Sequence, residues 1–142
     1  MKKIRVLVVD DSALVRKILS DILSRDSAIE VVGTAQDPIF AAQKIQRLTP
    51  DVLTLDIQMP KMDGLTFLKQ LMRTNPIPTV MVSSLTKESA LQTIQALERG
   101  AVDVVEKPSD LSQMDALGAT LIAKIKVAAN SKVRASRTRI AT

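Results

Sequence analysis

The stretch Asp51-Val52-Leu53-Thr54-Leu55-Asp56 is an apolar run that ends on a carboxylate. Its composition predicts a buried β-strand. A second apolar run, Ile4–Val9, is followed directly by Asp10 and Asp11. If both runs are parallel strands of one sheet, three carboxylates meet at its C-terminal edge. Neighbouring negative charges drive one carboxyl toward protonation unless a cation lies among them. The sequence therefore predicts a functional site at this edge.

Three further apolar runs place these strands in a larger sheet. The runs are rich in Val, Ile and Leu and several lack polar alternation, which is typical of parallel strands covered on both faces. The five expected strands are Ile4–Val9, Ile29–Ala35, Asp51–Asp56, Ile77–Ser83 and Ala101–Val105. Strands that alternate with helices predict right-handed βαβ units and a doubly wound α/β sheet. Such sheets bind ligands outside the carboxyl ends of their strands.

Five amphipathic segments connect and follow these strands. Their expected first or capping residues are Ser12, Asp37 with Pro38, Gly64, Thr86 and about Asp110. The fourth segment carries Leu91, Ile94 and Leu97 at helical spacing, which predicts an apolar face, and it is expected to end at Gly100. The fifth loses its helical register after about Asn130, so 131–142 is expected to be a linker or a frayed end.

The composition limits the chemistry available to the site. The 142 residues include no cysteine and no histidine. Disulfides and thiol chemistry are thereby excluded, as are the commonest general base and metal ligand. A metal ion held here must be a hard one that prefers oxygen ligands, such as Mg²⁺. The apolar runs are too short for membrane insertion, and no signal peptide is evident, so a cytoplasmic location is expected.

The net charge of +5 is distributed unevenly. All 15 acids lie within residues 1–115, which also contain 14 of the 20 Lys and Arg residues. The other six basic residues are Lys124, Lys126, Lys132, Arg134, Arg137 and Arg139. Such a tail can attract nucleic acid or anionic lipid. A solvated helix end is the favoured interpretation, because the charges are spread out and the tail has no aromatic residue for base stacking.

Four segments together resemble the receiver domain of two-component response regulators. They are Val8-Val9-Asp10-Asp11-Ser12, the run from Asp56 to Gly64, Val82-Ser83-Ser84 and Glu106-Lys107-Pro108. The resemblance covers roughly residues 1–125 and leaves 126–142 as a basic helix end and linker. It implies a flavodoxin-like sheet with strand order 2-1-3-4-5 and five helices.

The resemblance also implies roles for the acidic residues. Asp56 would be the phosphoacceptor, a carboxylate nucleophile that becomes an acyl phosphate. Asp11 and Asp56 would hold Mg²⁺ directly, together with the backbone carbonyl of Gln58, and Asp10 would act through a water molecule. The side chain of Gln58 is expected to tune how fast water removes the phosphoryl group.

Further roles follow for the other strand ends. Lys107 would place its charge on the phosphoryl oxygens, aimed by a cis bond to Pro108 as in the family. Ser83 would donate its hydroxyl to the phosphoryl group. Val104 occupies the position where many receivers carry an aromatic switch residue, and the chain's two aromatic residues, Phe40 and Phe67, lie elsewhere. An aromatic switch is therefore not expected.

The sequence around these motifs is most similar to the receiver of the chemotaxis protein-glutamate methylesterase. The similarity includes Arg5 to Ala13, Asp51 to Asp56, Met81-Val82-Ser83-Ser84-Leu85-Thr86 and Gly100 to Asp103. It implies phosphorylation by a chemotaxis histidine kinase and control of a methylesterase and deamidase that acts on chemoreceptors. A chain without histidine cannot contain a Ser-His-Asp triad, so the chain alone is not expected to be that enzyme.

Three other functions are compatible with parts of the pattern. The chain could be a stand-alone receiver that acts by binding another protein, or the receiver of a DNA-binding regulator. It could also be a Mg²⁺-dependent phosphatase with an aspartate nucleophile. Such enzymes usually place an acid/base aspartate two residues after the nucleophile, where this chain has Gln58, which disfavours the third interpretation.

Overall fold

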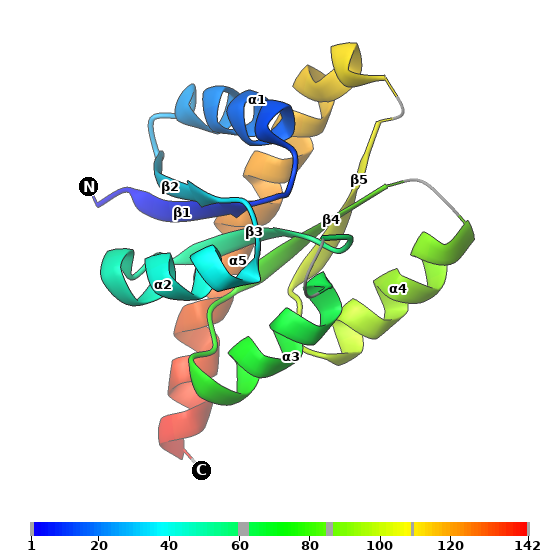
Figure 1. Ribbon diagram of the computed structural model, residues 1–142. Helices are drawn as coiled ribbons and strands as arrows, with labels where there is room; N and C mark the ends of the chain where they lie inside the picture. Colours follow the sequence, from blue (N-terminus) through cyan, green and yellow to red (C-terminus); the bar gives the residue numbers. More distant parts are fainter. Residues whose placement is uncertain (1, 60–62, 85–86, 109, 142) are drawn as a thin grey trace.

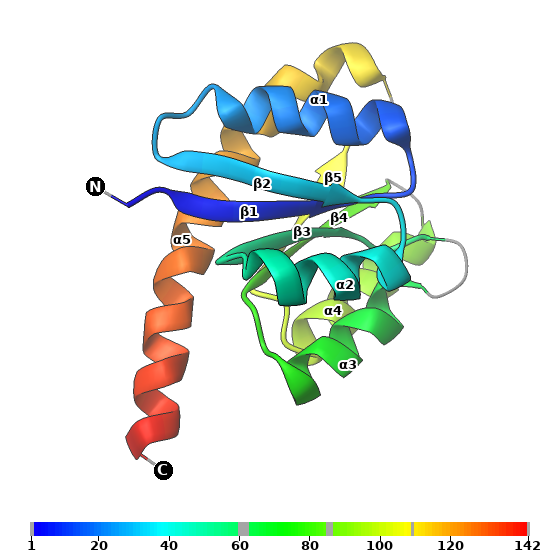
Figure 2. The same cartoon turned by 60° about the vertical axis from the view of Figure 1, so that its left-hand side comes forward.

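A five-stranded parallel sheet organises the chain (Figures 1 and 2). The computed structural model describes residues 2–59, 63–84, 87–108 and 110–141. The strands are β1 (Ile4–Val9), β2 (Ile29–Ala35), β3 (Val52–Asp56), β4 (Thr79–Ser84) and β5 (Asp103–Lys107). The helices are α1 (Ala13–Ser24), α2 (Pro38–Leu48), α3 (Gly64–Thr74), α4 (Lys87–Glu98) and α5 (Met114–Ala141), with a 3₁₀ turn at Leu111–Gln113.

The strand order β2-β1-β3-β4-β5 confirms the expected doubly wound topology. Helices α1 and α5 pack on one face of the sheet, while α2, α3 and α4 cover the other (Figure 2). The order reverses between β1 and β3, which pair in parallel from Val6 with Val52 to Val9 with Leu55. The residues that follow both strands therefore lie at the point where the strand order reverses, which is where ligands bind in this class of sheet.

The predicted caps hold the starts of the first helices. The Ser12 hydroxyl accepts a hydrogen bond from Val15 N at 3.2 Å, and Asp37 Oδ1 accepts one from Phe40 N at 3.0 Å. Pro38 occupies the first turn of α2 as expected. These bonds satisfy backbone donors that a helix start leaves without an intrahelical partner. Thr86, the expected cap of the fourth helix, lies outside the described residues.

Three strands begin later than their apolar patterns predicted, and β3 does so by a single residue, at Val52 instead of Asp51. Strand β4 starts at Thr79 instead of Ile77, because Pro78 has no backbone N–H to donate to a ladder. Strand β5 starts at Asp103 instead of Ala101. Ala101 N instead donates to Ala96 O and closes the end of α4, where Gly100 has a φ of 114°. Strand β5 also ends two residues later than predicted, at Lys107 instead of Val105, so Lys107 pairs with Ser84 inside the sheet.

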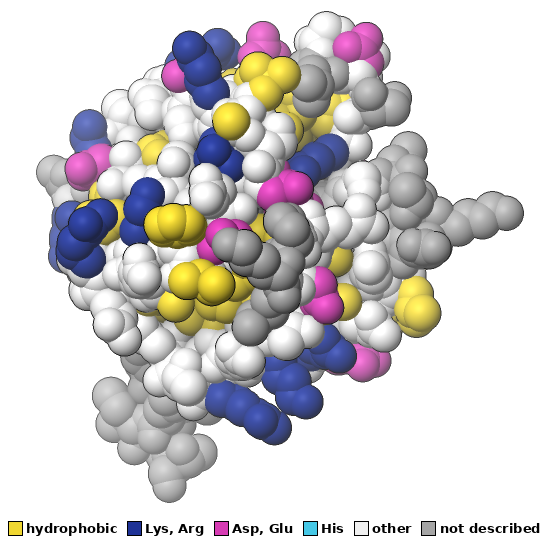
Figure 3. Space-filling view, in the orientation of Figure 1, with side chains coloured by type: hydrophobic (Ala, Val, Ile, Leu, Met, Phe, Trp, Pro, Cys, Tyr) yellow, Lys and Arg dark blue, Asp and Glu magenta, His cyan; other side chains and the backbone are white. Residues whose placement is uncertain are grey.

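Helix α4 packs with a different face from the one that its apolar pattern predicted. Leu91, Ile94 and Leu97 are 61%, 56% and 46% exposed, and among the described side chains of this helix only Ala96 is buried. Figure 3 shows hydrophobic side chains at the surface in the region of α4. Two polar residues of the helix, Gln92 and Gln95, line a cleft beside α3. The apolar face is therefore left to solvent.

Helix α5 extends farther than its register predicted. It is helical to Ala141, and its last turns project beyond the sheet (Figures 1 and 2). The stretch after Asn130 contains neither proline nor glycine, so nothing in it interrupts the backbone. Two lysines of the basic tail also contact the domain: Lys124 pairs with Asp103 at 2.7 Å and Lys126 with Asp26 at 3.0 Å. Within the described residues, no helix has the length and apolarity to cross a bilayer.

Candidate functional site

The carboxyl ends of β1 and β3 bring three acidic side chains together. Carboxylate oxygens of Asp10, Asp11 and Asp56 all lie within 4.8 Å of one another. Asp10 and Asp56 are buried, with 1% and 4% exposure, whereas Asp11 is exposed. The convergence of these three residues agrees with the sequence prediction. A site that offers only oxygen ligands, two of them on buried carboxylates, fits a hard divalent cation such as Mg²⁺.

Lys107 supplies the positive charge in this cluster. Its Nζ lies 2.8 Å from Asp10 Oδ2 and 3.4 Å from Asp56 Oδ2. Burial lowers the pKa of Lys107, but the two carboxylates outweigh burial and raise it overall, so the side chain is charged at neutral pH. The expected cis bond to Pro108 is absent: no peptide bond among the described residues is cis. The ammonium reaches both acids from the last position of β5 with a trans bond.

The environment of Asp56 favours its protonated form. Burial is the main cause and the charge of Asp10 is the second, and together they raise the pKa of Asp56 from 3.8 to about 7. The charge of Lys107 and a hydrogen bond from Gln58 N, at 3.2 Å from Oδ1, act in the opposite direction. A carboxylate destabilised in this way gains more than an exposed one from a cation or a covalent partner.

Asp10 is fixed by its own backbone and by its neighbours. Its N–H donates to Ala35 O at 3.0 Å and so continues the pairing of β1 with β2 by one residue. Its Oδ1 accepts a hydrogen bond from Ser12 N at 2.9 Å. The side chain therefore has one orientation, with Oδ2 toward Lys107.

Gly64 lets the start of α3 approach the end of β3 closely. Gly64 N donates to Ile57 O at 2.7 Å, and a Cβ on this residue would lie 2.2 Å from Asp56 O. Glycine is required at this position because any side chain would push α3 away from the backbone that carries Asp56.

Ser83 lies at the predicted edge but uses its hydroxyl locally. It is buried, and its Oγ donates to Ser84 O at 3.1 Å. The neighbouring Ser84 Oγ contacts Gln58 Oε1 at 3.4 Å and so links the end of β4 to the loop after β3. Sequence spacing did not predict this contact. Val104 is half-buried and packs against the core, so no aromatic side chain occupies this position.

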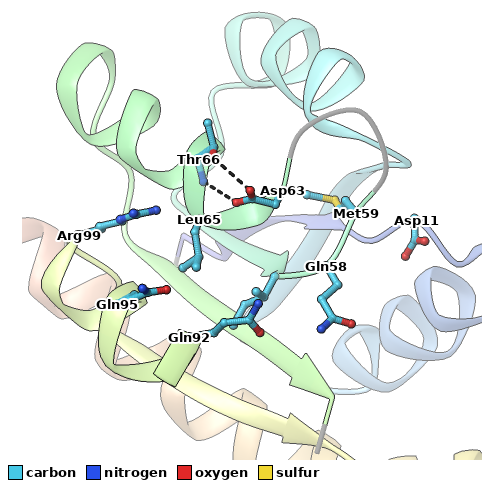
Figure 4. A pocket seen from close by; sticks show the side chains of 10 residues that line it. Asp11, Gln58, Met59, Asp63, Leu65, Thr66, Gln92, Gln95 and Arg99 are labelled. Carbon is cyan, nitrogen blue, oxygen red and sulfur yellow. Dashed lines mark hydrogen bonds between the residues drawn. The ribbon is translucent and has the colours of Figure 1, made fainter. Parts of the chain in front are cut away.

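A cleft of about 790 Å³ opens beside the acidic cluster, between α3 and α4 (Figure 4). Asp11 and Gln58 lie at one end of the cleft, and Arg99 lies at the other (Figure 4). The rim at α3 is held by Asp63, which accepts hydrogen bonds from Thr66 N at 2.8 Å and Thr66 Oγ1 at 3.2 Å. The acidic cluster is therefore reached from solvent on the side of Asp11.

Comparison with known proteins matches residues 6–117 to the response regulator receiver domain. Curated relatives include a protein-glutamate methylesterase/protein-glutamine glutaminase of Xanthomonas oryzae pv. oryzae, 55% identical over 93% of this chain. One from Geobacter metallireducens is 53% identical over 92% of this chain. In both cases the match covers 37% of the relative's length, so the chain spans little more than a third of these proteins.

Two solved structures are similar to this chain in fold as well as in sequence. The response regulator domain of Thermotoga maritima CheB is 45% identical with a TM-score of 0.84, covering 91% of this chain and 98% of that one. The CheX-CheY-BeF₃-Mg²⁺ complex from Borrelia burgdorferi matches at 31% identity with a TM-score of 0.73, covering 87% of both chains. Taken with the sheet order and the acidic cluster, these matches show that the chain belongs to the family of response regulator receiver domains.

Proposed function

We propose that Asp56 accepts a phosphoryl group and that the acidic cluster binds the Mg²⁺ required for this reaction. The observation that supports the proposal most directly is the grouping of Asp10, Asp11 and Asp56, with the ammonium of Lys107 beside Asp10 and Asp56. Such a grouping combines a carboxylate nucleophile, ligands for a hard cation and a point charge for phosphoryl oxygens. The Borrelia burgdorferi complex, a family member with Mg²⁺ and BeF₃ in its name, supports the same assignment.

Asp11, Asp56 and the backbone carbonyl of Gln58 would hold Mg²⁺ directly, with Asp10 acting through water. The bound ion supplies charge neutralisation for the carboxylates and for the transferring phosphoryl group. The exposure of Asp11 lets it reach a hydrated ion from the solvent side. The burial of Asp56 keeps the nucleophile away from competing solvent hydrogen bonds.

The reaction is a transfer from a phosphorylated histidine of a kinase. An oxygen of the Asp56 carboxylate attacks phosphorus, the P–N bond to the imidazole breaks, and the ring nitrogen keeps the electron pair and takes up a proton. Lys107 lies within 3.4 Å of the nucleophile and places a positive charge beside the new phosphoryl oxygens. The Ser83 hydroxyl, which donates to Ser84 O here, would turn toward a phosphoryl oxygen.

The regulated partner is proposed from the relatives. The two curated proteins named above are methylesterases and glutaminases, and the chain spans 37% of their length. We therefore propose that this receiver controls a protein-glutamate methylesterase domain that acts on chemoreceptors. A chemotaxis histidine kinase would donate the phosphoryl group, and both steps would take place in the cytoplasm. Residues 1–125 form the receiver, and 126–142 lead from it toward the effector. The exposed face Leu91, Ile94 and Leu97 of α4 provides an apolar surface for that effector.

Intact-mass spectrometry tests the phosphorylation directly. The purified chain is incubated with Mg²⁺ and acetyl phosphate, with and without EDTA. We expect one added phosphoryl group in the presence of Mg²⁺ only, and none in Asp56→Asn. The matched control is Asp63→Asn. Asp63 is an exposed acid close to the site, and it caps α3. Undiminished modification of the Asp56→Asn variant would contradict the assignment.

A further inference from the structure

The guanidinium group of Arg16 is bound to the backbone of the acidic cluster. Arg16 lies in α1, is half-buried, and donates from Nη1 to the carbonyl oxygen of Asp10 at 2.7 Å. We infer that Arg16 is a positioning residue for the metal-binding carboxylates at the end of β1. This inference rests on the proposed function, because it concerns how the chain prepares its own residues for Mg²⁺.

The backbone carbonyl of Asp10 accepts its hydrogen bond from Arg16, whereas the other three polar atoms of Asp10 have other partners. Its N–H pairs with Ala35 O at 3.0 Å, Oδ1 accepts from Ser12 N at 2.9 Å, and Oδ2 pairs with Lys107 at 2.8 Å. The carbonyl lies past Val9, the last residue of β1 in the sheet ladder. A backbone carbonyl at a buried residue needs a partner. Arg16 provides one, and a bond from a charged donor is stronger than one from a neutral amide.

The hydrogen bond to this carbonyl also restricts the backbone position of Asp11. The peptide unit that joins Asp10 to Asp11 is planar, so the position of its oxygen sets the orientation of its N–H and of the next Cα. Asp11 is exposed and its side chain is not enclosed by the core. The direction of its carboxylate therefore depends on the backbone that carries it. In metal sites, groups that hold the ligands affect affinity strongly, and their loss costs about 10- to 100-fold.

The same arrangement occurs at the neighbouring strand. Lys44 of α2 donates from Nζ to the carbonyl of Thr34, near the end of β2. Arg16 and Lys44 both line a small cavity of about 270 Å³ together with Phe40. Each helix cation thus binds the backbone near the end of the strand beside it. Only Arg16 does so at a residue of the acidic cluster, and its neighbour Lys17 is exposed on the same helix.

The inference is tested by Mg²⁺ binding to the unphosphorylated chain, measured by isothermal titration calorimetry. We expect Arg16→Met to raise the Kd for Mg²⁺ roughly tenfold. Arg16→Lys should recover part of this loss, because an ammonium can donate one hydrogen bond to the same carbonyl. The control Lys17→Met removes a positive charge one residue away and should leave the Kd within about twofold. Urea unfolding in EDTA verifies that each variant is folded, and Arg16→Gln replaces Arg16→Met if the latter is not.

Phosphorylation by acetyl phosphate at increasing Mg²⁺ separates positioning from other roles. In Arg16→Met the Mg²⁺ concentration for half-maximal rate should rise with the Kd, while the rate at saturating Mg²⁺ stays near that of the wild type. An unchanged Kd in folded Arg16→Met, or a rate loss that saturating Mg²⁺ does not repair, overturns the inference alone. Failure of the wild type to bind Mg²⁺, or to be modified on Asp56, overturns the proposed function and the inference with it.

Discussion

The ammonium of Lys107 lies 2.8 Å from Asp10 Oδ2, although β3 and β4 stand between their strands in the sheet. The two residues are far apart in the sequence, and their ion pair crosses the carboxyl ends of the two strands between them. The same ammonium is 3.4 Å from Asp56 Oδ2. Two buried carboxylates repel each other, and a shared cation offsets that repulsion in a site with little water. Lys107 therefore determines how much negative charge the site holds before a metal ion binds.

Replacing Lys107 with Met should make Asp56 still harder to ionise. The charge of Lys107 lowers the pKa of Asp56, which is nevertheless about 7, so its removal should raise that pKa above 7. The measurement is a pH titration of the ¹³C carboxyl shifts in the metal-free chain. Lys124→Met is the control, because Lys124 pairs with Asp103 at the edge strand and away from the acidic cluster. A pKa of Asp56 that is the same in both variants would show that Lys107 does not act on this carboxyl.

The metal-free chain should lose stability between about pH 4 and pH 7. The pKa of Asp56 is 3.8 when unperturbed and about 7 in the folded chain. The folded state therefore binds the proton more tightly, and the free energy of unfolding falls as pH rises through this window. The loss amounts to at most about 4 kcal/mol and is complete above pH 7. Asp26, Asp103 and Asp110 have lowered pKa values, so they titrate below this window.

Urea unfolding in EDTA at pH 5 and pH 8 measures this dependence. The wild type should be less stable at pH 8, and the difference should largely disappear in Asp56→Asn, whose amide does not titrate. Asp10, Asp11 and Lys107 face Asp56 and are kept in both proteins. Added Mg²⁺ should stabilise the wild type more at pH 8 than at pH 5, because the ion competes with a proton at low pH. A wild-type stability that rises from pH 5 to pH 8 in EDTA would contradict the raised pKa.

Sequence patterns predicted the sheet because its strands are short apolar runs with clear ends. The bounds of β1 and β2 agree with the prediction, and the caps at Ser12 and Asp37 follow from local hydrogen bonding. The error at α4 comes from long-range packing. Leu91, Ile94 and Leu97 have the spacing of a core stripe, yet they face solvent. Helical spacing shows that apolar residues share a face, but it does not show what covers that face.

The site was predictable to the level of which strand ends meet. Parallel strands place their carboxyl ends at one edge, so Asp10, Asp11 and Asp56 could be grouped from the sequence alone. The bond of Arg16 to Asp10 and the contact of Ser84 with Gln58 could not. Both depend on rotamers of long side chains across different elements, which no spacing rule specifies. The trans bond after Lys107 likewise differs from the family expectation.

Gly64→Ala should destabilise the chain by about 3 kcal/mol, because the new Cβ would lie 2.2 Å from the backbone oxygen of Asp56. Relief of this contact requires α3 or the backbone of Asp56 to move, and a shift of the Asp56 backbone displaces the nucleophile, so phosphorylation of Asp56 should also slow. Gly33→Ala is the matched control: its Cβ would meet the end of the Leu48 side chain at 2.9 Å, and that side chain can rotate. Urea unfolding should show a loss of less than about 1 kcal/mol for Gly33→Ala. Equal losses in the two variants would show that the approach of α3 to β3 is not tight.

Polar substitutions on the apolar face of α4 should leave the receiver itself intact. Leu91→Gln and Ile94→Gln change side chains that are 61% and 56% exposed, so each should alter the free energy of unfolding by less than about 0.5 kcal/mol. Leu68→Ala on α3, where the side chain is fully buried, should cost about 2–5 kcal/mol in the same urea experiment. Phosphorylation of Asp56 by acetyl phosphate should be unchanged in both α4 variants, because these residues do not line the site. A core-like loss of stability in Leu91→Gln or Ile94→Gln would mean that α4 buries this face in solution, and the surface proposed for the effector would then not exist.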